Sequence, residues 1–163
     1  CLAGLHKHQG PSRRHRGTKK NGPQSIGKSR GGWNTKIHMV AADARTAIAF
    51  SLSGGNANDA PQGRQLLQYL YASEPTHLLM DRAYADDLTR AVAQERGFIA
   101  VVAPRRDRKQ PWDYDRQMYK RRNEVQRLFR RIKAYRRVFT RYDKLDVVFL
   151  AFLTFALTVE GLR

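Results

Sequence analysis

The chain has 163 residues, which gives room for about one domain with a moderate core. It carries 31 Lys and Arg residues against 14 Asp and Glu residues, a formal net charge of +17 at pH 7. Such a charge favours a polyanionic partner, above all nucleic acid, although an anionic membrane surface or ribosomal RNA would suit the same bulk charge.

Cysteine content and hydropathy argue against a disulfide-bonded or cysteine-zinc protein and against a membrane protein. The only cysteine, Cys1, excludes an internal disulfide and a cysteine-based zinc site, which fits a reducing cytoplasm. The apolar run 147–159 has 13 residues, whereas a bilayer needs about 20, so it predicts a buried helix and no membrane partner. The chain does not begin with Met and no secretory signal precedes its basic start, which indicates a piece of a longer protein.

The first residues read as a basic arm. Residues 1–30 hold eight basic side chains and no acid, and residues 1–32 are rich in Gly, Pro and Ser with little periodicity. We therefore predict a loop or arm over 1–32, with a remnant of a first strand, and a folded domain over 33–163.

Alternating and β-branched residues predict a hairpin after this arm, with strands at 33–40 and 47–52 joined by a turn at Asp43. Asn58 or Asp59 then caps a helix that holds Pro61 in its first turn. For Asp59, a capping role is favoured over a role as metal ligand.

The next segments alternate between strand and helix. Residues 77–80 read as a buried strand ending in Asp81, residues 85–96 as a helix stopped by Gly97, and residues 98–103 as a second buried strand. This alternation predicts an α/β sheet covered on both faces. Ligands gather beyond the carboxyl ends of such strands, which makes Asp81 a candidate site residue; the alternative is that Asp81 only caps the following helix.

Cations and aromatic rings are concentrated toward the C-terminal half. Residues 104–144 hold sixteen basic and five acidic side chains. The loop that contains Arg105, Arg106, Arg108 and Lys109 is followed by Trp112 and Tyr114, a mixture suited to gripping a DNA backbone and stacking on a base. The alternative is a solvated loop.

Residues 119–133 carry two helical patterns at once. Val125, Leu128, Phe129 and Ile132 have the spacing of a helix laid on a core. On such a helix, at about 100° per residue, the side chains of four polar residues fall within roughly 60° of one another. These are Tyr119, Arg122, Gln126 and Lys133. The plainer interpretation is a basic amphipathic helix with a solvated face. The final helix is expected to bury Val148, Phe149, Phe152, Phe155, Ala156 and Val159.

These motifs resemble the DDE transposases of bacterial insertion sequences, in particular the insertion-sequence-five and insertion-sequence-four-like groups. Their last catalytic helix has the signature Y-x2-R-x3-E-x6-K, which this chain matches except that Gln126 stands at the Glu position. Their second signature, D-x-G/A-Y, is matched by Asp81, Ala83 and Tyr84. Glu124 lies about 200° from Gln126 around the helix and cannot replace it. The first catalytic Asp is absent, with Ala3 in its place or the first strand truncated.

The resemblance implies a ribonuclease H-like, retroviral-integrase-like fold, with a mixed sheet flanked by helices. It implies phosphoryl transfer on DNA with two Mg²⁺ ions, or Mn²⁺, held between three carboxylates. Asp81 would be a metal ligand, Gln126 would occupy the catalytic Glu position, and Tyr119, Arg122 and Lys133 would hold phosphates. The further DNA-binding residues expected are Arg105, Arg106, Arg108, Lys109, Arg136, Arg137 and Lys36.

Three functions remain open on the sequence. The first is a transposase domain acting on transposon ends and target DNA, impaired because one of three carboxylates is retained. The second is an inactive remnant that binds DNA or pairs with intact transposase, and the third is an unrelated basic RNA-binding protein. Cleavage of end-sequence DNA with Mg²⁺ or Mn²⁺ separates the first two. The first two place the protein in the bacterial cytoplasm at the nucleoid, either alone, as a homodimer or with an intact transposase.

Overall fold

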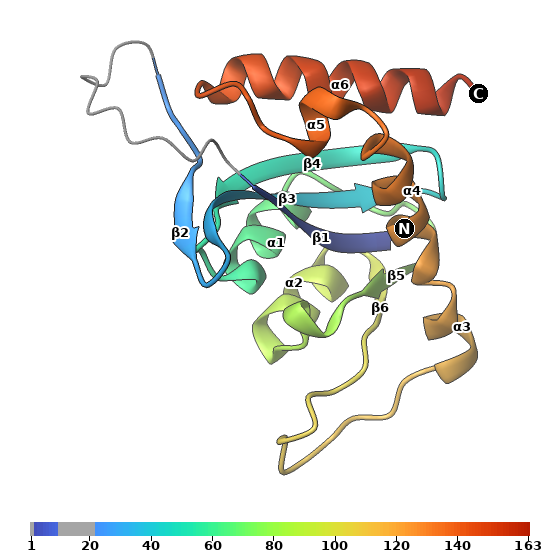
Figure 1. Ribbon diagram of the computed structural model, residues 1–163. Coiled ribbons are helices and arrows are strands. Elements are labelled where there is room, and N and C mark those ends of the chain that lie inside the picture. Colours follow the sequence, from blue (N-terminus) through green and yellow to red (C-terminus); the bar gives the residue numbers. More distant parts are fainter. Residues whose placement is uncertain (1, 10–21) are drawn as a thin grey trace.

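The computed structural model describes residues 2–9 and 22–163, and its centre is a six-stranded mixed sheet (Figure 1). The strands are β1 (Leu2–Gln9), β2 (Gly27–Ser29), β3 (Gly32–Ala41), β4 (Ala47–Gly54), β5 (Thr76–Met80) and β6 (Phe98–Val101). Strand order is β2-β3-β1-β5-β6, and β4 pairs with β3 beyond the end of β2. β3 is antiparallel to β1, β2 and β4, whereas β1, β5 and β6 run parallel.

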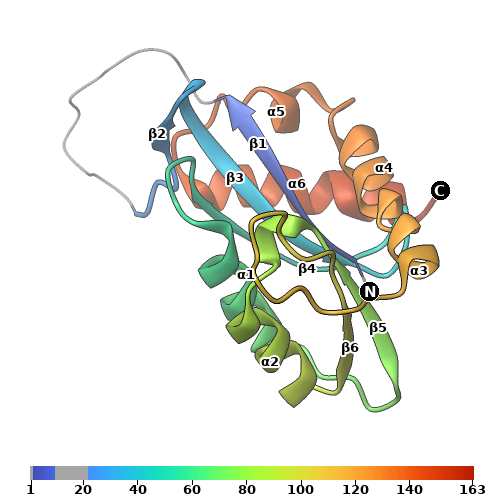
Figure 2. The ribbon, with the colours of Figure 1, turned by 90° about the horizontal axis from the view of Figure 1, so that it is seen from below.

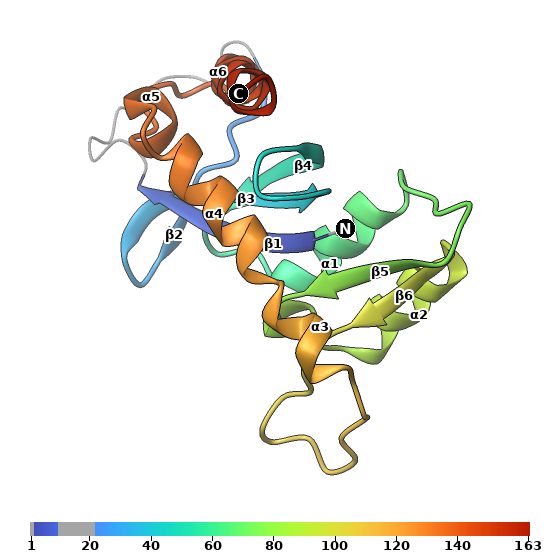
Figure 3. The same cartoon turned by 90° about the vertical axis from the view of Figure 1, so that its right-hand side faces the viewer.

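Helices cover both faces of the sheet, as the alternation of elements predicted (Figure 3). One face carries α1 (Asp59–Leu67), the short 3-10 helix η1 (Arg82–Tyr84) and α2 (Asp87–Glu95). The other carries α4 (Asn123–Ile132), α5 (Arg136–Phe139) and α6 (Asp146–Gly161), while α3 (Arg116–Lys120) leads into α4. No helix in the described part of the chain is long and apolar enough to cross a membrane.

β3 is the strand that holds the two layers together, because its side chains point alternately into two cores. Ile37, Met39 and Ala41 pack with α4 and α6, whereas Val40 packs with α1 and η1. Every residue of β3 from Asn34 onward is buried. Its polar residues therefore need internal partners, and these partners shape the site described below.

Three sequence-based expectations need correction. The first strand is not a mere remnant within an arm: Leu2–Gln9 forms an eight-residue strand between β3 and β5. The glycine and basic residues of this segment do not have the pattern of a strand, and its pairing partners, β3 and β5, lie far away in the sequence. The helix expected over 119–133 is two helices, broken at Arg121 and Arg122. The arm segment 10–21 lies outside the described residues.

The third correction concerns α6, which buries a different stripe from the one expected. Phe149 and Ala156 are buried as expected, but Phe155 is 63% exposed and Val148 is 36% exposed. Leu153 and Leu157 occupy the core instead. The sequence is apolar around the whole helix, so hydropathy alone could not indicate which side faces the sheet.

Candidate active site

Asp81 lies at the carboxyl end of β5, directly after the buried residues Leu78, Leu79 and Met80. It is the N-cap of η1, and its Oδ1 accepts a hydrogen bond from the Arg82 backbone N–H at 2.8 Å. The same oxygen forms an ion pair with Arg122 Nη1. Asp81 is therefore a helix cap, which is one of the two alternatives from the sequence, and it also forms an ion pair with the basic segment at the start of α4.

Arg122 reaches Asp81 from the short helical turn that joins α3 to α4. Arg121 and Arg122 keep helical backbone angles between the two helices, and the Arg122 N–H bonds to the Tyr119 carbonyl at 3.1 Å. The Arg122 guanidinium lies 5.2 Å from the centre of the Tyr119 ring, and Tyr114 packs edge-on against that ring at 5.4 Å. Burial raises the pKa of the Tyr119 hydroxyl, so it remains a neutral donor.

Gln126 lies one helical turn beyond Arg122, so the two side chains leave α4 on the same face, with Cβ atoms about 5–6 Å apart. Gln126 is exposed. Arg122 thus stands beside both Asp81, by direct contact, and Gln126, by helical spacing. Lys133 is the C-cap of α4, roughly 16 Å along the helix axis from Arg122, so it lies at the other end of the stripe.

Strand register shows what lies beside Ala3, one of the two alternatives for the missing first Asp. Ala3 on β1 lies beside Met80 on β5, the residue that precedes Asp81. The position expected to carry the first Asp is therefore on the strand adjacent to Asp81. No sequence pattern in this segment had indicated that pairing.

Tyr84, the last residue of the D-x-A-Y motif, packs η1 against the sheet. It is 2% exposed, and its hydroxyl lies 3.1 Å from Nδ1 of His38 on β3. Nε2 of His38 lies 2.8 Å from Ser53 Oγ on β4. Gly63 on α1 makes room for the ring, since a Cβ there would approach Tyr84 carbons to 2.5 Å. Tyr84 therefore anchors the short helix η1, which Asp81 caps, against β3 and α1, a packing role that the sequence did not reveal.

Two further residues have partners that differ from those expected. Lys36 is 6% exposed, and its ammonium donates to Asp59 Oδ1 at 2.6 Å and to the Ala57 carbonyl at 2.5 Å. Its charge is thus used inside the protein, and we remove Lys36 from the expected DNA-binding set. Asn58 is the N-cap residue of α1, and Asp59 is the first residue of the helix. The Asp59 carboxylate forms an ion pair with Lys36.

The cationic loop after β6 is partly fixed by its own contacts. Arg108 forms a two-pronged ion pair with the Asp87 carboxylate at 2.7 and 2.8 Å. Arg90 and Arg108 both lie over the Trp112 ring, at 4.1 and 4.5 Å, and Trp112 Nε1 donates to the Val102 carbonyl. Trp112 therefore serves packing and not base stacking. Other basic residues of the expected set are exposed: Arg105, Arg106, Lys109, Arg136 and Arg137.

The donor set at Asp81 does not fit a pair of divalent metal ions. Mg²⁺ is usually held by one or two carboxylates together with waters and substrate phosphates, and a two-metal site needs carboxylates for both ions. Here the Asp81 carboxylate is paired with Arg122, and Gln126 offers only a neutral amide oxygen. Among the described residues, no three His, Cys, Asp or Glu side chains are grouped so that they could hold a metal ion.

Comparison with known proteins shows the family to which the chain belongs. A family model described as "Transposase DDE domain" matches residues 6–159, and members of that family use divalent metal ions. A Brucella ovis protein named "Putative transposase for insertion sequence element IS6501" is 28% identical over 130 residues, which is 79% of this chain and 98% of that protein. No solved structure matches. Because the family model covers nearly the whole sequence, the chain belongs to the transposase DDE domain family.

Proposed function

We propose that this chain is a transposase domain that still binds transposon-end DNA but is impaired in phosphoryl transfer. The single observation that carries the proposal is the Asp81–Arg122 ion pair, in which an arginine occupies the carboxylate that the family signature assigns to a metal ion. The missing acids at positions 3 and 126 leave one carboxylate where three would be needed.

DNA binding does not require those missing acids. The exposed cations on the loop, on α3 and on α5 keep their charge whether or not a metal is bound. We further infer a ribonuclease H-like fold; the three antiparallel strands β1, β3 and β4 beside the parallel pair β5 and β6 support it. Mg²⁺ or Mn²⁺ is the expected ion for any residual activity, at the nucleoid, in a homodimer or together with an intact transposase.

Restoring the acids tests this proposal. The variant Ala3→Asp/Gln126→Glu is expected to nick DNA that carries the terminal sequences of its own element when Mg²⁺ or Mn²⁺ is added, because it then carries the three carboxylates of the family signature. The wild-type chain is expected to bind the same DNA with little or no nicking. Nicked product is quantified on a denaturing gel.

The control for added charge is Ala3→Asp/Gln68→Glu, in which Gln68 is an exposed residue at the end of α1. This control should stay inactive, as should the restored variant when it also carries Asp81→Asn. Efficient metal-dependent nicking by the wild-type chain would contradict the proposed impairment. Binding without cleavage by every variant would favour the second candidate, a binding remnant, which the Asp81–Arg122 pair also supports.

A further inference from the structure

The hairpin formed by β2 and the start of β3 lies at one end of the sheet (Figure 2), and its sequence holds two cations and an aromatic residue. Lys28 and Trp33 are paired directly across the two strands, so their side chains leave the hairpin on the same face. Arg30 lies in the two-residue turn between the strands. Lys28 and Arg30 are exposed, and Trp33 is 43% exposed.

Hydrogen bonds and close backbone packing hold the hairpin at its turn and at its base. Ser29 Oγ accepts hydrogen bonds from Asn34 Nδ2 at 2.5 Å and from the Gly31 N–H at 3.3 Å. Gly32 adopts φ +94°, a conformation that favours glycine. At the base, a Cβ on Gly27 would approach Asn56 Oδ1 to 1.9 Å. The backbone is therefore closely packed where the hairpin joins the sheet, while its tip side chains face solvent.

The charge of the hairpin has no internal use. Within residues 22–163, no carboxylate forms an ion pair with Lys28 or Arg30. The first acidic residue of the sequence is Asp43, at the turn between β3 and β4. Two cations without ion-pair partners beside a partly exposed Trp form a combination that suits phosphates and a stacked base.

Strand register relates the hairpin to Asp81. Ala3 on β1 is level with Met80, and Gln9, six residues further along β1, pairs with Asn34 at the base of the hairpin. That separation corresponds to roughly 20 Å along the strand. The hairpin therefore lies beyond the carboxyl end of β5. The distance between the base of the hairpin and the end of β5 corresponds to roughly six nucleotide steps along one DNA strand.

We propose that this hairpin is a second DNA contact, in which Lys28 and Arg30 hold phosphates and Trp33 stacks on a base of an unpaired strand. The inference rests on the proposed function, since it assigns to the same DNA a point of contact away from Asp81.

The test measures affinity of the full chain for a fluorescein-labelled duplex with a single-stranded overhang, by fluorescence polarisation. Arg30→Ala is expected to raise Kd about fivefold and to reduce the slope of log Kd against log salt by about 1. Trp33→Ala should raise Kd about fivefold or more. The matched controls, expected to bind as the wild type does, are Arg45→Ala at the opposite end of β3 and Tyr69→Ala at the end of α1, both exposed.

Tryptophan fluorescence adds an independent readout, because the chain has two Trp residues and Trp112 is covered by Arg90 and Arg108. DNA should quench the wild-type signal, and Trp33→Phe should lose that quenching. If the wild type binds DNA while the hairpin variants match their controls, the hairpin inference is overturned and the proposed function stands. If the wild type does not bind DNA at all, the proposed function fails first.

Discussion

At the scale of single residues, the candidate site depends on polar groups that the fold has to bury. His38 is 1% exposed between the Tyr84 and Ser53 hydroxyls. Burial, partly opposed by the nearby Asp59, lowers the pKa of His38 from 6.5 to about 4. The ring is therefore neutral at physiological pH and serves as a hydrogen-bonding spacer between β3, β4 and η1.

This histidine predicts a specific loss of stability in acid. Below pH 6.5 the unfolded chain binds a proton at His38 that the folded protein does not bind until about pH 4, so the folded state loses stability as the pH falls through this window. The loss attributable to His38 approaches about 3 kcal/mol near pH 4. Urea unfolding of the wild type and His38→Gln at several pH values measures it as the difference between the two curves. Parallel curves between pH 7 and pH 4 would contradict the assignment.

Gly63 is a second residue whose role was hidden in the sequence. Ala normally stabilises a helix relative to Gly by about 1 kcal/mol, but a Cβ on Gly63 would collide with the Tyr84 ring. We expect the clash to dominate, so that Gly63→Ala lowers the free energy of unfolding by about 1–3 kcal/mol. Gly161→Ala is the control, because a Cβ at this position on α6 has no heavy atom within 4 Å. Chemical denaturation should show opposite signs for the two variants.

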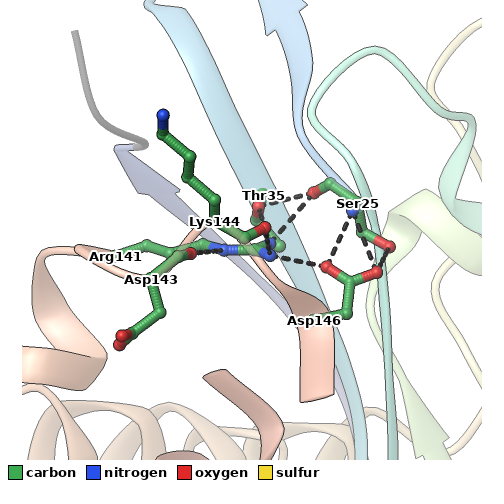
Figure 4. A network of polar contacts seen from close by, with 6 residues as sticks. All are labelled: Ser25, Thr35, Arg141, Asp143, Lys144 and Asp146. Atoms are coloured by element: carbon green, nitrogen blue, oxygen red, sulfur yellow. Dashed lines mark hydrogen bonds and ion pairs between the residues drawn. The ribbon is translucent and has the colours of Figure 1, made fainter. Parts of the chain in front are cut away.

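At the scale of elements, one buried arginine joins segments that are far apart in the sequence (Figure 4). The Arg141 side chain is fully buried and forms an ion pair with Asp146 at 2.5 Å at the start of α6. It also donates to Thr35 Oγ1 on β3 and to the carbonyl of Ser25 before β2. Asp146 in turn accepts from the Ser25 N–H and hydroxyl. The network ties α6 and the approach to the β2–β3 hairpin to the middle of the sheet.

Arg141→Lys should therefore be costly although it keeps the charge. A lysine cannot reproduce the planar fork of donors, and it leaves Thr35, Asp146 or a carbonyl without a partner. We expect a loss of about 3 kcal/mol, which corresponds to roughly 6–12 °C in Tm for a chain of this size. Arg136→Lys on exposed α5 is the control and should change Tm little. An equal Tm for Arg141→Lys and wild type would show that this network does not stabilise the fold.

How far the sequence could predict these elements depends on how local their signals are. The hairpin of β3 and β4, the strand before Asp81 and the helix stopped by Gly97 have their signals within a few residues, and each is present in the structure. β1 has no such pattern, because its pairing partners lie in β3 and β5. The Asp81–Arg122 contact spans 41 residues, and family resemblance, not spacing, indicated that the two segments meet. The roles of Gly63 and Arg141 depend on tertiary packing, which no local pattern encodes.

At the scale of the whole molecule, the chain has a net charge of +17. Few of the cations on the exposed loop and α5 form ion pairs with acids among the described residues. The loop and α5 flank α3 and α4 in the sequence between β6 and α6, and Figure 3 shows them at the two ends of this pair of helices. A polyanion bound there would neutralise charges that otherwise repel each other. Affinity for DNA should therefore come mainly from released counterions.

The corresponding prediction is a steep salt dependence that is reduced by specific substitutions. Each phosphate contact contributes about 0.9 to the slope of log affinity against log salt, so Arg105→Ala/Arg106→Ala/Lys109→Ala should reduce its magnitude by up to about 3. Arg45→Ala should leave the slope unchanged, because this arginine lies in the β3–β4 turn, away from the loop. Filter binding over a range of salt concentrations measures both slopes. A wild-type slope near zero would mean that the positive charge serves something other than DNA binding, and an unchanged slope in the triple variant would place the phosphate contacts elsewhere on the protein.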